Sequence, residues 1–251
     1  MKEVLELLWA PFSEVGLYGE IRAIKNGLVN QFFMPTEEPE LHEAYAQEQS
    51  RLGFDVYFGV LPRVRKSGTA GDCVSTSAVL WSDVDAKRFG AGKLGALQAV
   101  NDLGPVPQVL VDSGGGLHAY WLLAEPVPFD QARRAMEYIA QAVNGDATYD
   151  AARVLRVPGT VNYKYRNYAR VLRLDATAPR YRISDFPVIE MRPNPNGPVP
   201  KRPSSQQVDW TGAHEIPKWL NVLIEKGAPR GQRSEASYKV AIWLFLAGQQ
   251  W

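Results

Sequence analysis

The chain has 251 residues, of which 45% are hydrophobic and 22% charged, and its formal net charge is +1. These values are typical of a globular protein with a full core, and they require that any nucleic-acid site be a local basic patch. The single cysteine, Cys73, excludes an internal disulfide framework and a multi-cysteine zinc module within this chain, and it suits a reducing cytoplasm. The sequence shows no signal peptide and no apolar run of bilayer length, so we expect a cytoplasmic protein without a membrane partner.

The first sixty residues predict alternating helices and strands. A short helix is expected over Lys2–Leu8, and two extended segments within Tyr18–Met34 are joined at Asn26-Gly27, a strong hairpin signal. The pattern then predicts a helix over Thr36–Leu52, with acidic residues in its first turn. The β-rich run FDVYFGVL, Phe54–Leu61, predicts a strand.

The loop after this strand carries three cations, Arg63, Arg65 and Lys66. A basic loop of this kind is either a solvated surface segment or a contact to phosphate groups. Both interpretations stay open at the level of the sequence.

The octet AVLWSDVD, Ala78–Asp85, is an apolar run that ends in two aspartates one residue apart. In a strand, the period of two turns Asp83 and Asp85 to the same face and Val84 into the core. Two carboxylates aimed at one point repel each other unless a proton, a cation or a basic partner lies between them. A divalent cation that prefers oxygen ligands, Mg²⁺ or Mn²⁺, is the simplest occupant, so the pair predicts a metal site.

A helix over Lys93–Leu103 and a short strand over Gln108–Asp112 lead to the stretch SGGGLHAYWLL, Ser113–Leu123. Three successive glycines are expected where the chain turns sharply or where a ligand approaches the backbone, and their amides could bind an anion. In the strand that follows, the period of two places His118 and Tyr120 on a polar face. A tight hairpin with a half-exposed histidine explains the same pattern without a ligand.

A helix over Phe129–Val143 closes at Asn144-Gly145 and leads into a basic segment. This segment has six cations and no acidic residue: Arg153, Arg156, Lys164, Arg166, Arg170 and Arg173. The local excess could bind a polyphosphate or a nucleic-acid backbone, or it could be the charge-protected edge of a sheet. Asp150, just before the segment, could add a third carboxylate.

The C-terminal quarter predicts a linker and two helices. Residues 191–208 are rich in proline and polar residues, as linkers are, and helices are expected over Ile216–Glu225 and Ser234–Ala247. We therefore expect a main domain over residues 1–190 and a helical appendage over residues 209–251. Either the appendage packs on the main domain or the natural protein continues past it. Strands and helices alternate without a regular repeat, which predicts an α+β fold with a largely antiparallel sheet.

Several chemistries can be compared with this pattern. The three histidines are scattered and no signature surrounds Cys73, so a cysteine nucleophile is not supported, and zinc ligands are too few. An Asp-x-Asp site that holds a metal and a nucleotide sugar, as in many glycosyltransferases, stays open.

Three stretches occur in a fixed order: DVD, then SGGGLH, then D-x-x-R-x-x-R-V-P-G-T-x-N-x-K. This order resembles the archaeo-eukaryotic primase superfamily, in particular the primase-polymerases of plasmids, phages and integrated mobile elements. The similarity covers roughly Phe54–Leu174. It implies an N-terminal αβ unit packed against a module like the RNA-recognition motif, with the active site between them.

The resemblance also implies roles for individual residues. Catalysis and metal binding fall to Asp83, Asp85 and Asp150, with Asp146 as a competitor for the third position. Nucleotide binding falls to Ser113, Gly115, Gly116, His118, Arg153, Arg156, Asn162 and Lys164. The candidate DNA contacts are Arg63, Arg65, Lys66, Arg166 and Arg170. Tyr163, Tyr165 and Tyr168 are candidates for base stacking, although tyrosines at such spacing more often belong to a core or a sheet edge.

The implied function is template-directed nucleotidyl transfer on single-stranded DNA, as a primase or polymerase with two Mg²⁺ or Mn²⁺ ions, in replication of a mobile element or in repair. The implied partners are the template and nucleoside triphosphates, with a separate helicase or single-strand-binding protein as further candidates. Two alternatives stay open. One is the metal-dependent glycosyltransferase, and the other is a non-catalytic protein that binds DNA at a replication origin.

Overall fold

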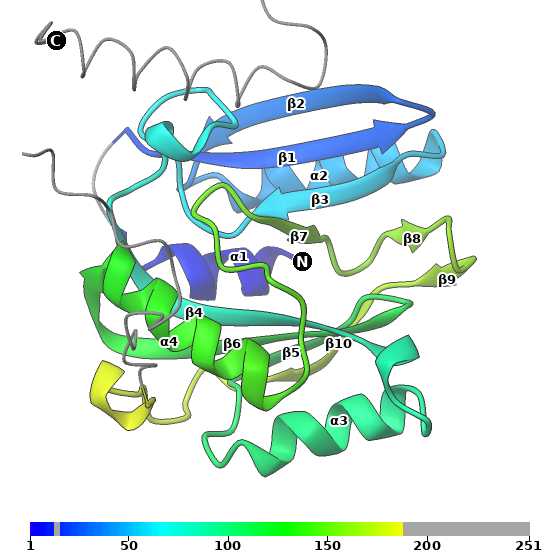
Figure 1. Ribbon diagram of the computed structural model, residues 1–251. Coiled ribbons are helices and arrows are strands. Elements are labelled where there is room, and N and C mark those ends of the chain that lie inside the picture. The colour runs from blue at the N-terminus through cyan, green and yellow to red at the C-terminus, as the bar shows by residue number, and fades with distance from the viewer. Residues whose placement is uncertain (13–15, 188–251) are drawn as a thin grey trace, which may run out of the picture. The chain divides into compact units, whose positions relative to one another are not determined.

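Two four-stranded antiparallel sheets form the framework of the protein in the computed structural model, which describes residues 1–12 and 16–187 (Figure 1). The first sheet has the order β2 (Leu28–Pro35), β1 (Tyr18–Lys25), β3 (Asp55–Gly59) and β7 (Val154–Arg156). The second sheet has the order β10 (Arg170–Leu174), β5 (Val109–Asp112), β6 (Gly116–Pro128) and β4 (Thr76–Asp85). A separate hairpin consists of β8 (Val161–Asn162) and β9 (Asn167–Tyr168).

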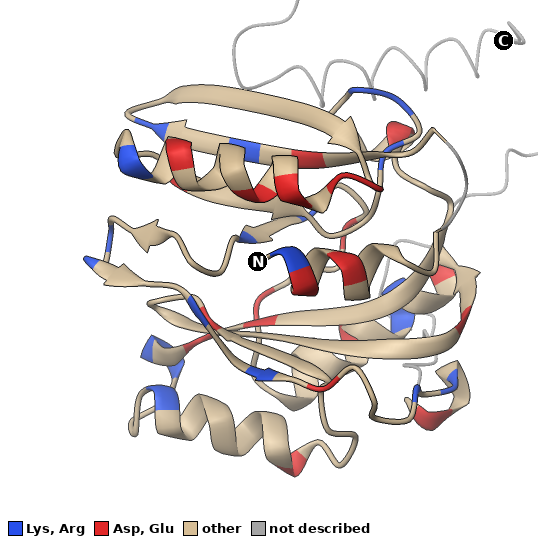
Figure 2. Ribbon diagram, turned by 180° about the vertical axis from the view of Figure 1, so that it is seen from behind, with Lys and Arg blue, Asp and Glu red and all other residues tan. Residues whose placement is uncertain are grey.

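The α-helices of the described part are α1 (Lys2–Trp9), α2 (Pro39–Arg51), α3 (Lys93–Asp102) and α4 (Phe129–Ala142). Three short 3-10 turns complete the elements: η1 (Ala70–Asp72), η2 (Ala86–Arg88) and η3 (Ile183–Asp185). Helix α2 packs on the first sheet, whereas α3 and α4 pack on the second. Seen from behind, α1 and α2 lie close together (Figure 2), and an ion pair of 2.6 Å joins Lys2 Nζ to Glu40 Oε1. Within residues 1–12 and 16–187, no helix is both long enough and apolar enough to cross a membrane.

The hairpin of β1 and β2 confirms the turn predicted at Asn26-Gly27. Both residues have positive φ, 49° and 82°, which asparagine and glycine adopt more readily than other residues. The turn sets the register in which Lys25 pairs with Leu28. Because side chains alternate along the strands, Ile21 of β1 and its partner Phe58 of β3 point to the same face, and both are fully buried.

Helix α2 begins at Pro39, three residues later than the sequence predicts. The reason is that the hairpin extends further than expected: the backbone N–H of Thr36 donates to the carbonyl oxygen of Leu17 at 3.1 Å. Thr36 is thereby held beside the hairpin instead of capping the helix. Pro39 is a favourable first residue because it has no N–H that would need a partner there.

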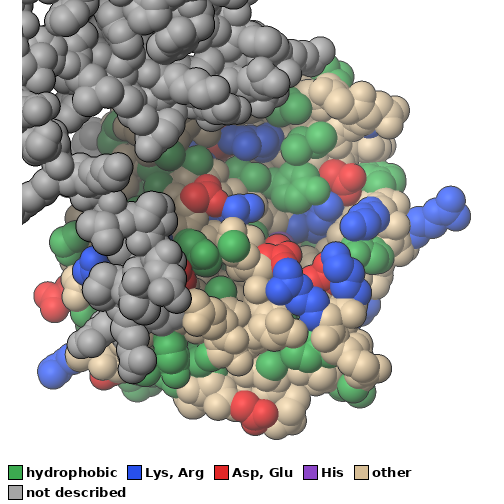
Figure 3. Space-filling view, in the orientation of Figure 1, with side chains coloured by type: hydrophobic (Ala, Val, Ile, Leu, Met, Phe, Trp, Pro, Cys, Tyr) green, Lys and Arg blue, Asp and Glu red, His purple; other side chains and the backbone are tan. Residues whose placement is uncertain are grey.

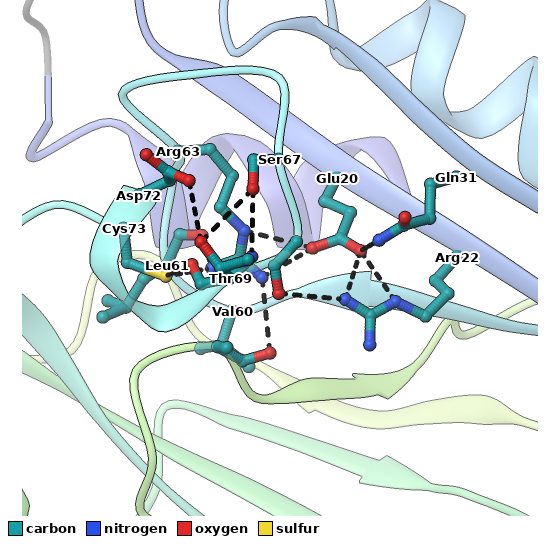
Figure 4. A network of polar contacts seen from close by, with 12 residues as sticks. Glu20, Arg22, Gln31, Val60, Leu61, Arg63, Ser67, Thr69, Asp72 and Cys73 are labelled. Atoms are coloured by element: carbon teal, nitrogen blue, oxygen red, sulfur yellow. Dashed lines mark hydrogen bonds and ion pairs between the residues drawn. The ribbon is translucent and has the colours of Figure 1, made fainter. Parts of the chain in front are cut away.

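A buried ion pair fixes the loop between β3 and η1 to the first sheet (Figure 4). Glu20 and Arg63 are both fully buried, and Arg63 Nη2 lies 2.7 Å from Glu20 Oε2. The other carboxylate oxygen accepts hydrogen bonds from Arg22 and Gln31, at 2.7 and 2.9 Å. Arg63 also lies 2.7 Å from the Cys73 sulfur. Arg63 is therefore a structural residue, and it is not exposed for the DNA contact that the sequence suggested.

The face of β6 expected to be polar is buried. His118 is 4% exposed and Tyr120 0%, because other parts of the fold cover this face of the second sheet. One of them is Phe58 of the first sheet, and the centroid of its ring lies 6.3 Å from that of Tyr120. The half-exposed histidine of the simple hairpin interpretation is therefore wrong. The strand itself is confirmed and extends to Pro128.

The α+β fold with antiparallel sheets is confirmed. The predicted linker over residues 191–208 and the helices beyond it lie outside the described residues. The domain boundaries accordingly stay a prediction.

Candidate active site

The paired aspartates lie at the C-terminal end of β4, as the sequence predicts. Asp83 and Asp85 are partly exposed on one face of the strand, and Val84 between them is fully buried. The antiparallel register with β6 places Asp83 opposite His118, and Asp85 opposite Gly116. Two segments that are distant in sequence thus contribute neighbouring residues to one site.

A pocket of about 250 Å³ opens at this point, between the two sheets. It is lined by Asp55, Tyr57, Asp83, Asp85, Ser113, Gly115, Gly116, His118, Asp146, Arg156, Asn162, Lys164 and Tyr165. On the face of the molecule shown in Figure 3, acidic and basic side chains lie side by side. The pocket therefore joins all three stretches that the sequence singled out.

The glycine turn between β5 and β6 forms one wall of the pocket. The N–H of Ser113 donates to the carbonyl oxygen of Gly116 at 3.0 Å, and Gly114 has φ +92°, a conformation that residues with a side chain rarely adopt. The amide of Asn162 donates to the carbonyl oxygen of Ser113 at 2.7 Å, which attaches the β8–β9 hairpin to the turn. A Cβ atom on Gly115 would lie 2.2 Å from the ring of Tyr165, so a larger residue there would require this ring to move.

His118 lies at the base of the site. Its Nε2 is 3.6 Å from Asp83 Oδ1, longer than a hydrogen bond. Burial lowers the pKa of His118, and the nearby Asp83 carboxylate only partly offsets this effect. The ring is therefore neutral at pH 7, and its buried Nδ1 has no hydrogen-bond partner among the described residues. A neutral imidazole here can donate or accept a hydrogen bond.

Two cations from η2 neutralise carboxylates at the mouth of the pocket. Lys87 Nζ lies 2.6 Å from Asp85 Oδ2, and the backbone N–H of Lys87 donates to Oδ1 of the same carboxylate at 3.1 Å. Burial alone would raise the pKa of Asp85, but these hydrogen bonds and the charges of Lys87 and Lys164 together lower it. The next residue, Arg88, forms an ion pair with Asp146.

Arg156 at the end of β7 forms the opposite wall. It is 5% exposed, and its Nη1 lies 2.8 Å from Asp55 Oδ1. Its Nη2 donates to the Tyr57 hydroxyl at 2.9 Å. Asp55 and Tyr57 were not predicted as site residues, although strand periodicity places both on one face of the predicted strand. Their partner Arg156 is distant in sequence, so no local pattern identifies the contact.

Of the two candidates for the third carboxylate, Asp146 lines the pocket and Asp150 does not. The backbone N–H of Asp146 donates to the carbonyl oxygen of Asp83 at 2.7 Å, which fixes the turn after α4 against β4. Asp150 forms an ion pair with Arg153, and neither residue lines the pocket. The close approach of Asp146 depends on how the chain leaves α4 after Gly145, and the sequence pattern does not contain that information.

The remaining candidates lie on the surface. The side chain of Arg65 is 81% exposed, Lys66 lies over the ring of Tyr18, and Arg166 and Arg170 are exposed. The three tyrosines beside the basic segment are also exposed, at 40% for Tyr163, 42% for Tyr165 and 62% for Tyr168. Their exposure argues against a core role and leaves their rings accessible to a ligand.

The carboxylates fit Mg²⁺ or Mn²⁺ by donor type. Asp83 and Asp85 present hard oxygen donors on one face, and Asp146 lines the same pocket. In the described part of the chain, however, no three His, Cys, Asp or Glu residues are close enough together to form a ready metal cluster. Asp146, the third carboxylate that could join them, is paired with Arg88 through its Oδ1.

Comparisons with known proteins agree with this description at the level of the fold. No family model matches the sequence. Over 135 residues, 48% of this chain, the sequence is 28% identical to an uncharacterised protein of Methanocaldococcus jannaschii, and it spans only 10% of that protein's length.

Two solved structures have a similar fold. One is the AEP domain of the cyanophage S-2L primase-polymerase, with a TM-score of 0.54 and 16% identity, covering 74% of this chain and 95% of that one. The other is the primase RepB', with a TM-score of 0.50 and 12% identity, covering 70% of this chain and 57% of that one. The chain therefore shares the fold of these two primase structures, which confirms the fold class expected from the sequence.

Proposed function

We propose that the protein is a template-directed nucleotidyltransferase, a DNA primase or primase-polymerase that acts on single-stranded DNA with two Mg²⁺ or Mn²⁺ ions. The observation that supports this most is the convergence of three distant sequence stretches on one pocket. Paired carboxylates, a glycine turn with a buried histidine, and cations from the Arg156–Lys164 segment lie together there. Metal-dependent nucleotidyl transfer needs carboxylates to bind the metal ions, and it needs cations and hydrogen-bond donors to hold the triphosphate.

The carboxylates would bind the metal ions. Asp83 and Asp85 point into the pocket from β4, and Asp146 approaches from the turn after α4. Bound divalent ions would lower the pKa of a 3′-hydroxyl and stabilise the charge of the departing pyrophosphate.

The triphosphate would lie along the glycine turn, between it and Arg156. Lys164 and Arg156 supply positive charge, and the neutral His118 can donate a hydrogen bond from its buried position. Asn162 keeps the β8–β9 hairpin, and with it Lys164, beside the glycine turn. These residues hold and orient the substrate.

The template would be bound through its backbone and its base faces. Arg166 and Arg170 can contact phosphates near the pocket, and Arg65 and Lys66 can do so from the loop before η1. The exposed rings of Tyr163 and Tyr168 suit stacking on bases. A cytoplasmic enzyme of this kind would depend on a separate helicase or single-strand-binding protein to expose its template.

A primer-synthesis assay tests the proposal. The chain is mixed with single-stranded DNA, labelled nucleoside triphosphates and Mn²⁺, and products are separated by length. Asp83→Asn and Asp85→Asn should each lower the rate by at least about a hundredfold, because a lost metal ligand costs several kcal/mol of transition-state stabilisation. Asp130→Asn is the matched control, because this carboxylate on α4 is 84% exposed and lies outside the pocket.

Two outcomes would overturn the proposal: no metal-dependent product with the unmodified protein, or undiminished product in both pocket variants. Saturable binding of nucleotide sugars without a template would favour the glycosyltransferase. Salt-sensitive DNA binding that survives loss of both aspartates, without any product, would favour the origin-binding protein.

A further inference from the structure

Lys87 and Arg88 are adjacent cations that hold different carboxylates of the pocket. Lys87 binds Asp85, and Arg88 forms an ion pair with Asp146 and donates to the carbonyl oxygen of Gly145 at 3.1 Å. By contrast, Asp83 has no lysine or arginine within 4 Å among the described residues, and the basic side chain within that distance is His118, whose Nε2 lies 3.6 Å from Asp83 Oδ1. The short turn η2 thus neutralises two of the three carboxylates that we propose as metal ligands.

The charges around the pocket balance only when these two residues are included. Four aspartates line the pocket against two cations, Arg156 and Lys164. Lys87 and Arg88 raise the number of positive charges to four. If the carboxylates bound two divalent ions, four positive charges would be added, and a nucleoside triphosphate carries about four negative charges to match them. Once metal ions take the place of Lys87 and Arg88 on Asp85 and Asp146, these two cations can bind the triphosphate instead.

Their ion pairs are easily exchanged. The side chains of Lys87 and Arg88 are 71% and 39% exposed, and ion pairs at such positions contribute little to stability. The turn that carries them is attached to the glycine wall of the pocket, because the N–H of Ala86 donates to the carbonyl oxygen of Gly115 at 3.1 Å. Both cations are therefore anchored beside the place where we expect the triphosphate.

We propose that Lys87 and Arg88 are exchangeable counter-ions: they neutralise Asp85 and Asp146 in the metal-free protein, and they bind phosphate oxygens of the incoming nucleotide when these carboxylates bind divalent ions. This inference rests on the proposed function and adds two nucleotide-positioning residues to it. It predicts that removing either cation changes the affinities for the metal ion and for the nucleotide in opposite directions. A purely structural role would not produce this result.

The test measures binding in the full chain without template, so that no synthesis occurs. Free Mn²⁺ is titrated by electron paramagnetic resonance at low salt, and a labelled deoxynucleoside triphosphate is then titrated in saturating Mn²⁺. In Lys87→Gln and Arg88→Gln, the affinity for Mn²⁺ alone should rise about fivefold, because a competing positive charge is gone. The affinity for the nucleotide should fall about tenfold, because a charge-assisted hydrogen bond is lost.

Matched variants separate this role from general effects. Arg133→Gln on α4 removes an arginine of similar exposure, 37%, that pairs with Asp130 and Glu137 outside the pocket, and it should change neither affinity. Arg88→Lys keeps the charge and should restore both affinities towards those of the unmodified protein.

The outcomes distinguish this inference from the function on which it rests. If the unmodified protein binds Mn²⁺ and nucleotide but both Gln variants behave like Arg133→Gln, the counter-ion role is wrong and the proposed function is untouched. If Mn²⁺ affinity falls in both Gln variants, the role is also wrong. If the unmodified protein binds no Mn²⁺, both proposals are overturned.

Discussion

Glu20 and Arg63 show how single residues far apart in sequence determine the shape of the N-terminal part. The two side chains are fully buried and 43 residues apart, and the backbone of Arg63 also pairs with Tyr18 through hydrogen bonds of 2.7 and 2.8 Å. From sequence, Arg63 is indistinguishable from its exposed neighbour Arg65. Only the partner on β1 decides that one arginine is structural and the other is available at the surface.

Glu20→Gln should lower the free energy of unfolding by about 3 kcal/mol, because Arg63 would keep a buried charge without its counter-ion. Urea unfolding followed by circular dichroism measures the change. Glu48→Gln is the control, because Glu48 pairs with Arg51 on the surface of α2 and its loss should cost no more than about 0.5 kcal/mol. A loss in Glu20→Gln no larger than that of the control would contradict the structural role of this ion pair.

The elements with a local signal were predictable, and those completed by distant partners were not. The hairpin at Asn26-Gly27 and helix α4 follow directly from turn chemistry and helical periodicity. Strand β7 carries no such signal: it has three residues and exists because Tyr57 of β3 pairs with Arg156. The aspartate pair was predictable from period two, whereas the position of Asp146 depends on a hydrogen bond to β4 that only the folded chain reveals.

The pairing of β4 with β6 depends on a glycine at the site. A Cβ atom on Gly116 would lie 2.2 Å from the carbonyl oxygen of Val84, and a backbone atom cannot move aside as a flexible side chain can. Gly116→Ala should therefore cost about 1–3 kcal/mol of stability. It should also disturb Asp85, which pairs with Gly116 across the strands.

Thermal unfolding and Mn²⁺ binding measure the two effects of Gly116→Ala separately. Gly71→Ala is the matched control, because a Cβ atom there meets no heavy atom within 4 Å and Gly71 does not have a positive φ. Equal stability of the two variants would show that the strands can separate locally at no cost, contrary to the register described above.

At the scale of the whole molecule, the net charge of +1 makes DNA binding depend on a few local cations. Arg166 and Arg170 are exposed and are the clearest candidates: Arg166 follows Tyr165, which lines the pocket, and Arg170 pairs with Asp112, just before the glycine turn. The logarithm of the DNA-binding constant falls linearly with the logarithm of the salt concentration. If each arginine contacts one phosphate, the double variant Arg166→Gln/Arg170→Gln should make this slope shallower by about 1.4 for single-stranded DNA.

Fluorescence anisotropy of a labelled oligonucleotide at several salt concentrations gives this slope. Arg51→Gln on α2 removes a side chain of 77% exposure that lies outside the pocket, and it should leave the slope unchanged. An unchanged slope in the double variant would place the DNA-binding surface elsewhere.

Strand β7 also determines when the site can form. The first sheet is built mainly from residues 18–59, yet its fourth strand comes from residues 154–156, and Tyr163 reaches back to Ser50 and Asp55 through hydrogen bonds. Contacts this distant along the chain close late and slow folding. During synthesis on a ribosome, the N-terminal sheet must therefore wait, with an open edge at β3, until most of the second sheet has emerged. A nascent chain would therefore complete its pocket only after the lining residues Arg156, Asn162 and Lys164 have emerged.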